Sequence, residues 1–89
     1  MRITYDTAKN QRNINERQLS FDDAANLDWE NARIMQDTRK DYPEPRYVAV
    51  GVLNNRMHVL CFAIIEDGIR VISFRKANKR EQKAYEAFN

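Results

Sequence analysis

The sequence predicts an α+β fold, in which a small, twisted and mostly antiparallel sheet packs against two N-terminal helices and one C-terminal helix. Two apolar runs, at residues 46–53 and 57–65, are separated only by Asn54, Asn55 and Arg56. Asparagine tolerates the left-handed backbone of tight turns, so the two runs form a hairpin. Polar stretches that favour helices lie before and after these runs, an order typical of one layered α+β domain.

The N-terminal part is expected to contain a strand, two helices and a second strand. Residues 2–5 alternate polar and apolar side chains, as a short strand does. Residues 7–17 are polar and contain neither Gly nor Pro, which favours a solvent-facing helix. Ser20 can cap a second short helix, with Asp23 as the acidic residue three positions later. Residues 32–37 are expected to form the second strand.

The C-terminal part is expected to end in a strand followed by a helix. A charged loop at 38–45 precedes the central hairpin, and a turn at 66–68 follows it. Residues 69–75 then form the last strand. Asn78 is well placed to cap the final helix, with Glu81 as its capping-box partner.

Length and composition restrict the class of protein. The 89 residues suffice for one small domain, which we assign to residues 1–89. A chain with 43% hydrophobic and 31% charged residues is neither disordered nor membrane-bound, and no apolar run approaches the roughly 20 residues of a membrane span. The N-terminus lacks the apolar core of a secretory signal, so we expect a cytoplasmic location. Cys61 lies in an apolar run and is interpreted as a small buried hydrophobic residue.

Charge is distributed unevenly along the chain. The net charge is only +2, but residues 20–44 are rich in acids and residues 69–86 are rich in Arg and Lys. Such asymmetry indicates a polyanionic partner for one face, RNA being the first candidate, although two ordinary solvated surfaces would produce the same pattern.

Four blocks of sequence, in order, form a family pattern. They are Asp6, Lys9 and Asn13; Leu19-Ser20-Phe21-Asp22-Asp23-Ala24; Asp37, Arg39, Asp41-Tyr42, Glu44 and Arg46 with Gly51 after them; and Arg70-Val71-Ile72-Ser73-Phe74-Arg75-Lys76-Ala77 with Glu81 and Tyr85. The chain resembles the BrnT toxins of bacterial type II toxin–antitoxin systems, which share the RelE-like ribonuclease fold. The resemblance covers almost the whole chain, and its last block is the most specific.

The resemblance has one departure. Glu16-Arg17-Gln18 stands where the family usually has Lys-His-Gly. Because Gln18 adopts positive φ less easily than Gly, we expect a different backbone path at this point. Any role of the family's histidine at this position is also absent.

The resemblance implies a small endoribonuclease that halts growth by cutting RNA. Its antitoxin would be BrnA-like, a separate ribbon-helix-helix protein, and the pair would bind operator DNA mainly through the antitoxin. By analogy, a dimeric antitoxin would give a heterotetramer of two toxins and two antitoxins.

Metal-independent RNA cleavage requires three actions: deprotonation of the 2′-hydroxyl, protonation of the leaving 5′-oxygen and stabilisation of charge on the phosphate. We expect no cofactor, and the scattered acidic residues show no metal-ligand spacing. The hypothesis is that Arg46 and Arg75 hold the phosphate while Lys76 or Tyr85 assists proton transfer. If their strands are antiparallel neighbours, Arg46, Arg75 and Lys76 would meet at one sheet edge. The residues expected to bind RNA are Arg39, Arg70, Lys79 and Arg80.

Structural explanations compete for several of these residues. His58, the single histidine, lies inside a strand run and is interpreted as structural rather than catalytic. Glu81 is explained by capping, Tyr85 can pack in the core, and an ion pair between Arg39 and Glu44 explains those two residues equally well. Two other functions remain open: a degenerate, non-catalytic partner of a DNA-binding repressor, and a general RNA-binding protein.

Overall fold

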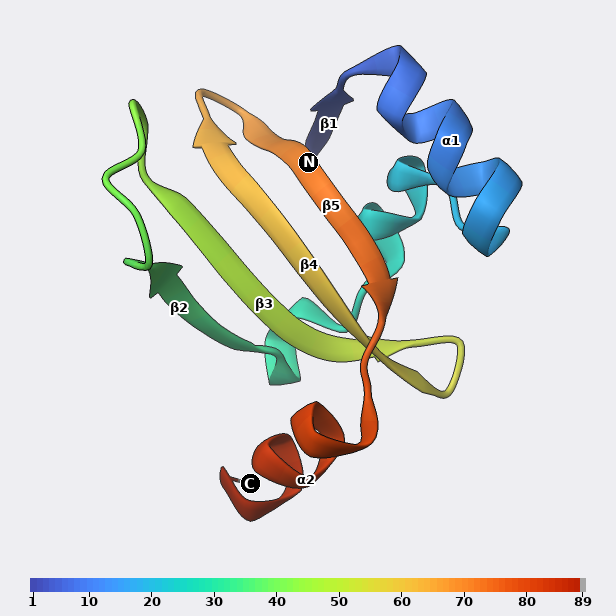
Figure 1. Ribbon diagram of the computed structural model, residues 1–89, viewed down its shortest axis with the longest axis vertical. Coiled ribbons are helices and arrows are strands. Elements are labelled where there is room, and N and C mark those ends of the chain that lie inside the picture. The colour runs from blue at the N-terminus through green and yellow to red at the C-terminus, as the bar shows by residue number, and fades with distance from the viewer. Residues whose placement is uncertain (89) are drawn as a thin grey trace.

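A five-stranded mixed sheet with the order β1-β5-β4-β3-β2 forms the centre of the computed structural model, which describes residues 1–88 without the side chain of Phe88 (Figure 1). Its strands are β1 (Arg2–Tyr5), β2 (Arg33–Asp37), β3 (Arg46–Leu53), β4 (Arg56–Ile65) and β5 (Gly68–Lys76). Only the β1–β5 pair is parallel. The prediction of an α+β fold with a mostly antiparallel sheet is therefore confirmed.

The helices differ from the prediction in one place. α1 (Thr7–Arg17) and α2 (Lys79–Phe88) are α-helices, but the expected second N-terminal helix is a 3₁₀ segment, η1 (Phe21–Asn26), followed by the short 3₁₀ turn η2 (Trp29–Asn31). Ser20 caps η1 as predicted, accepting a hydrogen bond from the backbone N–H of Asp22. The capping box is incomplete, however, because Asp is shorter than Glu and no hydrogen bond joins the Asp23 side chain to Ser20 within residues 1–88. The short segment stays in the tighter 3₁₀ form.

The predicted turns and the final cap are confirmed. Asn54 and Asn55 have φ values of 50° and 63°, the left-handed pair that a two-residue hairpin turn needs. At the start of α2, Asn78 and Glu81 exchange backbone-to-side-chain hydrogen bonds of 2.8 and 2.9 Å. Each turn therefore follows from local side-chain chemistry.

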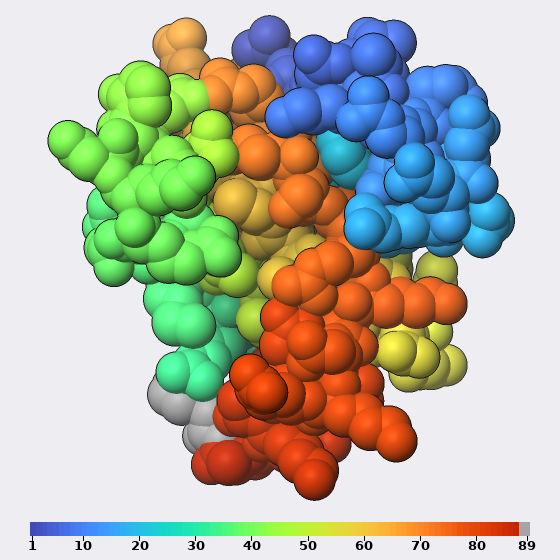
Figure 2. Space-filling model, viewed as in Figure 1, coloured from blue at the N-terminus to red at the C-terminus, as the bar shows by residue number. Residues whose placement is uncertain are grey.

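The hydrophobic core lies between the sheet and the 3₁₀ segments, which run behind the sheet in Figure 1. Phe21 and Leu27 pack in one cluster with Leu60 and Phe74, and all four side chains are buried. Because side chains alternate along a strand, the residues between the core positions point to the opposite surface of the sheet. We call this surface the open face. In Figure 2 it is hollowed between α1, β5 and the loop at residues 38–45.

Two buried amides attach α1, which has few apolar side chains, to the rest of the fold. The Asn13 side chain donates hydrogen bonds of 3.0 Å to the carbonyl oxygens of Leu19 and Phe74. The Asn10 side-chain oxygen accepts a 2.8 Å hydrogen bond from the Phe21 N–H. Specific polar contacts thus replace the apolar stripe that usually fixes a surface helix.

The turn after α1 differs from the expectation. Gln18 caps the helix with φ of 54°, the left-handed conformation that a glycine would adopt there. Its side-chain amide donates a hydrogen bond to the Asn15 carbonyl, which belongs to the last turn of the helix. The expected change of backbone path is therefore wrong at this residue, because Gln18 tolerates the left-handed conformation and satisfies a helix carbonyl as well.

Gly68 allows the first and last strands to pair. A Cβ atom at this position would lie 1.9 Å from the Arg2 carbonyl oxygen, which is backbone and cannot move aside cheaply.

Among the described residues, no helix is both long and apolar enough to cross a membrane.

Candidate active site

Strand order separates the two arginines that were expected to share an anion site. β3 and β5 both run antiparallel to β4, so they run in the same direction as each other. Arg75 near the end of β5 pairs with Val59, which pairs with Val50 on β3. Val50 is four positions beyond Arg46, or about 13 Å along the strand. The prediction that Arg46 meets Arg75 and Lys76 at one edge is therefore wrong.

Arg46 instead belongs to a group at the opposite end of the sheet. We call this group the loop-side cluster; it comprises Asp37, Arg39, Tyr42, Glu44, Arg46 and Arg70. The buried Asp37 carboxylate accepts hydrogen bonds of 2.8 and 2.9 Å from the Arg39 guanidinium and one of 3.1 Å from the Tyr42 hydroxyl. Glu44 forms an ion pair with Arg70. The anticipated Arg39–Glu44 pair is thus replaced by two pairs with other partners.

Electrostatics make the loop-side cluster a fixed structure. Hydrogen bonds from Arg39 hold the pKa of Asp37 well below its usual range and, reciprocally, raise the pKa of Arg39. Both groups therefore stay charged at any physiological pH. A buried carboxylate with this many donors organises the loop around it.

Arg46 is the cation of this cluster with unused hydrogen-bonding capacity. Its guanidinium carbon lies 4.3 Å from the centroid of the Tyr42 ring, in a cation–π contact. Its Nε is buried and has no hydrogen-bond partner among the described residues. A buried guanidinium donor without a partner is costly, so this Nε destabilises the cluster in the conformation seen here.

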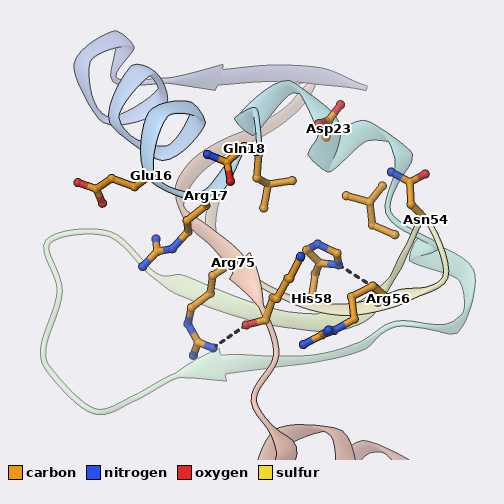
Figure 3. Close-up of a pocket in the computed structure, with 11 residues that line it drawn as sticks. Glu16, Arg17, Gln18, Asp23, Asn54, Arg56, His58 and Arg75 are labelled. Carbon is orange, nitrogen blue, oxygen red and sulfur yellow. Dashed lines mark hydrogen bonds between the residues drawn. The ribbon is translucent and has the colours of Figure 1, made fainter.

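A second group of cations surrounds a cavity of about 790 Å³ at the other end of β5, which we call the cleft. The residues that line it are Glu16, Arg17, Gln18, Leu19, Asp23, Leu53, Asn54, Arg56, His58, Arg75 and Lys76. Figure 3 shows Arg17, Arg56 and Arg75 around one opening, although they come from α1, β4 and β5. The sequence prediction named Arg75 and Lys76 but missed Arg17 and Arg56, because only the fold brings these distant positions together.

The arginines of the cleft have different partners. Arg75 forms hydrogen bonds of 2.8 and 2.9 Å with the two carboxylate oxygens of Glu81, and this contact lowers the pKa of Glu81 to about 2. Arg17 donates to the side-chain carbonyl of Asn13, and Arg56 donates to the backbone carbonyl of Ala77. Since Asn13 and Ala77 are neutral, the contacts that position Arg17 and Arg56 leave their charges unneutralised.

His58 lies in the wall of the cleft. It is 4% exposed, its Nδ1 is 2.7 Å from the Arg56 carbonyl oxygen, and its ring centroid is 5.5 Å from that of Phe74. Burial lowers its pKa, the hydrogen bond to the Arg56 carbonyl opposes this, and the charges of Lys76 and Arg56 add to the lowering. The expected position of this histidine within a strand is confirmed.

A family model described as the ribonuclease toxin BrnT of type II toxin–antitoxin systems matches residues 5–81. The chain belongs to the BrnT family. Ribonuclease activity and a protein antitoxin follow from this membership at the level of the family. Comparison of the sequence with curated proteins found no match, and neither did comparison with solved structures.

The BrnT match includes the whole loop-side cluster and all the residues that line the cleft. Tyr85 lies beyond the matched residues, on α2, where its hydroxyl donates a 2.8 Å hydrogen bond to the Asn31 carbonyl. This bond attaches α2 to η2. Lys79 and Arg80 are exposed in the first turn of the same helix, and Lys76 is exposed just before it.

Cys61 lies on the open face of this BrnT chain, half-buried in β4. Burial, followed by the charge of Asp37, raises the pKa of its thiol, while Arg46, Arg39 and Lys9 act in the opposite direction. Cys61 is thus less buried than expected, but a thiol with a raised pKa is a poor nucleophile, as the sequence interpretation implied.

Proposed function

We propose that this BrnT chain is a metal-independent endoribonuclease that arrests growth by cleaving RNA and is neutralised by a BrnA-type ribbon-helix-helix antitoxin. The observation that carries the proposal is the cleft, in which Arg17, Arg56, Arg75 and Lys76 surround one opening. Guanidinium groups bind phosphate with paired, geometrically specific donors. Within residues 1–88, Arg17 and Arg56 have only neutral hydrogen-bond partners, so their charge remains available to a polyanion.

In this proposal Arg75 and Lys76 act on the scissile phosphate. The hydrogen bonds to Glu81 hold Arg75 in one orientation and still leave its Nε free of any hydrogen bond within residues 1–88. A preorganised donor of this kind stabilises the charge that develops on the phosphate oxygens. Lys76, exposed at the end of β5, supplies a proton to the leaving 5′-oxygen.

Arg46 binds a second phosphate, at the far end of the open face. No acidic partner neutralises its charge among the described residues, which supports this role, and the separation from Arg75 requires the RNA to extend along β5. Further contacts to the RNA backbone come from Arg39, Arg70, Lys79 and Arg80. Tyr85 serves the site by holding α2, and hence Lys79 and Arg80, beside the cleft.

The antitoxin is proposed to cover the cleft with an acidic segment, in a heterotetramer of two toxins and two antitoxins. Operator DNA is then bound indirectly, through the antitoxin. Opposite charges accelerate protein association most strongly at low salt. An association rate that did not change with ionic strength would contradict an electrostatic cover.

The test compares Arg75→Ala with Glu81→Gln. Both changes break the Arg75–Glu81 ion pair, but Gln retains the capping geometry and leaves the Arg75 charge in place. Each protein is expressed from a repressed promoter, and growth and RNA ends are measured. We expect arrest and new RNA ends with the parent and with Glu81→Gln, and a loss of both of about 100-fold or more with Arg75→Ala. Circular dichroism verifies the fold of each variant. Equal losses in two folded variants would show that activity depends on the ion pair and not on the Arg75 charge itself, which would contradict the proposed role of that charge.

A non-catalytic role as partner of a DNA-binding repressor is the second candidate. It is favoured by the pairing of Arg75 with Glu81 and by Glu16-Arg17-Gln18 in place of Lys-His-Gly. On this alternative, the folded parent produces neither growth arrest nor new RNA ends, and it still changes operator binding by the antitoxin.

A further inference from the structure

His58 has a free ring nitrogen at the cleft. The partner of its Nδ1, at 2.7 Å, is the carbonyl oxygen of Arg56, which can only accept a hydrogen bond. Nδ1 therefore carries the proton, and in the neutral ring Nε2 holds the lone pair. Nε2 makes no hydrogen bond within residues 1–88. His58 is 4% exposed and lines the cleft, and Nε2 is not among the fully buried atoms that lack a partner, so it retains some exposure. Figure 3 shows this nitrogen on the side of the ring away from Arg56.

The surroundings of His58 hold its ring in one place. It lies within β4, packs against Phe74 with an interplanar angle of 53°, and is fixed at Nδ1 by the backbone of its own strand. A base held by a strand and by a second hydrogen bond keeps its orientation when a substrate arrives. This is more preorganisation than the exposed Lys76 has.

The charged groups around the cleft favour the neutral form of the ring. Burial is the main cause of its lowered pKa. The charged residues that face it from the surrounding elements are Arg56 of β4, Arg75 and Lys76 of β5, Arg17 and Glu16 of α1, and Asp23 of η1. The cations outnumber the acids, so at neutral pH the ring is unprotonated and ready to accept a proton.

We propose that Nε2 of His58 is the general base that takes the proton from the 2′-hydroxyl of the substrate RNA. This inference rests on the proposed ribonuclease function and deepens it. The cleft volume of about 790 Å³ accommodates a nucleotide beside the ring.

The reaction is a displacement within the RNA strand. The 2′-oxygen loses its proton to Nε2 and forms a bond to the phosphorus, while the bond from phosphorus to the 5′-oxygen breaks. The departing 5′-oxygen takes a proton from Lys76, and the guanidinium groups stabilise the charge on the remaining phosphate oxygens. The products are a 2′,3′-cyclic phosphate and a 5′-hydroxyl end. No redox change occurs. Afterwards His58 loses its added proton to water and Lys76 takes a proton from water, which returns both groups to their starting states.

The test is His58→Asn, measured with the purified full chain and a fluorescent RNA oligonucleotide. The side-chain amide of Asn can donate to the Arg56 carbonyl as Nδ1 does, but it places no base at the Nε2 position. We expect kcat to fall by about 100-fold to 10,000-fold. We also expect binding of a 2′-O-methyl RNA to stay close to that of the parent. The parent's kcat should rise with pH through the acidic range and level off by neutrality, whereas the residual rate of the variant should lack that rise.

The outcomes separate the two levels of the proposal. If the parent does not cleave RNA, the proposed function fails. If the parent cleaves and the folded variant keeps its rate and pH profile, His58 is a structural residue and the inference fails. The pH profile of the parent also tests the inference without any substitution, because a rate that does not decline at acidic pH would overturn it. The control variant is Arg2→Ala. Arg2 lies on the edge strand β1 and forms an exposed ion pair with Asp67, away from the cleft, so this variant should keep the parent's rate and pH profile.

Discussion

The loop-side cluster and the cleft contain similar side chains, but they differ in what those side chains are bonded to. In the loop-side cluster, Arg39 is paired with Asp37, and Arg70 is paired with Glu44. In the cleft, Arg17 and Arg56 donate to neutral carbonyl groups. The difference teaches that the number of arginines does not locate an anion site; the number without an acidic partner does.

Each end of the open face contains one exception that completes the comparison. Arg46 is unpaired among paired arginines, and Arg75 is paired among arginines with neutral partners. Arg46 thus gives the loop-side end one guanidinium without an acidic partner among the described residues, and Glu81 holds one guanidinium of the cleft in place. Three predictions follow from this contrast, in order of decreasing effect.

Two matched double variants compare the ends directly. Arg17→Ala with Arg56→Ala removes the two arginines that have neutral partners, and Arg39→Ala with Arg70→Ala removes two that have acidic partners. We expect the first pair to weaken RNA binding by about 100-fold and the second by less than about tenfold, since a charge already neutralised adds little to phosphate affinity. For the first double variant, the slope of log binding constant against log salt concentration should also become shallower by about 1.4.

The measurement is fluorescence anisotropy with a 2′-O-methyl RNA at several salt concentrations. Thermal unfolding should rank the variants in the opposite order, because Arg39 and Arg70 fix the loop. If the loop-side variants lose more RNA affinity than the cleft variants, the RNA lies at the other end of the sheet.

Acid should loosen the cleft end before the loop-side end. Glu81 has a folded-state pKa of about 2 against an ordinary value of 4.5, so its contribution to stability is complete above pH 4.5 and is lost as the pH falls toward 2. The pKa of Asp37 is lowered more strongly, so the loop-side pair persists to lower pH.

We expect the free energy of unfolding to fall by about 1 kcal/mol between pH 7 and pH 3 through Glu81, a value reduced for solvent screening of the partly exposed pair. Urea unfolding at the two pH values measures this loss, and NMR titration of the two carboxyl groups assigns it. Glu81→Gln should remove this component of the pH dependence. A carboxyl pKa near 4.5 for Glu81 would contradict the ion pair.

The smallest effect concerns the rim of the cleft. Gln18 adopts φ of 54°, a conformation that costs a non-glycine residue energy and a glycine very little. Gln18→Gly should therefore raise the free energy of unfolding by about 0.5 kcal/mol, after the loss of the hydrogen bond to Asn15. Urea unfolding at pH 7 measures the change. A decrease would mean that the side-chain hydrogen bond contributes more than the backbone conformation costs.

Local chemistry made most of the elements predictable. Alternation of polar and apolar residues located β1, two apolar runs located β3 and β4, and Asn54-Asn55 located the hairpin turn. The reciprocal bonds of Asn78 and Glu81 were predictable for the same reason, since partners three residues apart need no tertiary structure to meet. The 3₁₀ form of η1 was not predictable from Ser20 alone, because it depends on the incomplete capping box.

The site was only partly predictable, because it depends on strand order. Nothing local to Arg46 or Arg75 indicates that β4 lies between their strands and reverses their expected relation. Arg17 and Arg56 are 39 positions apart in the sequence and have no shared motif, so their meeting in the cleft is a property of the fold. Membership of the BrnT family indicates the class of activity, whereas the geometry assigns roles to side chains.

The parallel pairing of β1 with β5 has a consequence for the order of folding. Arg2 pairs with Gly68, so this contact closes a loop of 66 residues, while β3, β4 and β5 are joined by short turns. Closing that loop costs about 4 kcal/mol of chain entropy, and we expect β1 to join the sheet after the hairpins have formed. Because α1 follows β1 directly, Arg17 reaches the cleft only in this last step. A chain still lacking residue 68 contains the hairpin of β3 and β4 but cannot assemble the complete site, so the cleft forms only after β5 has been added.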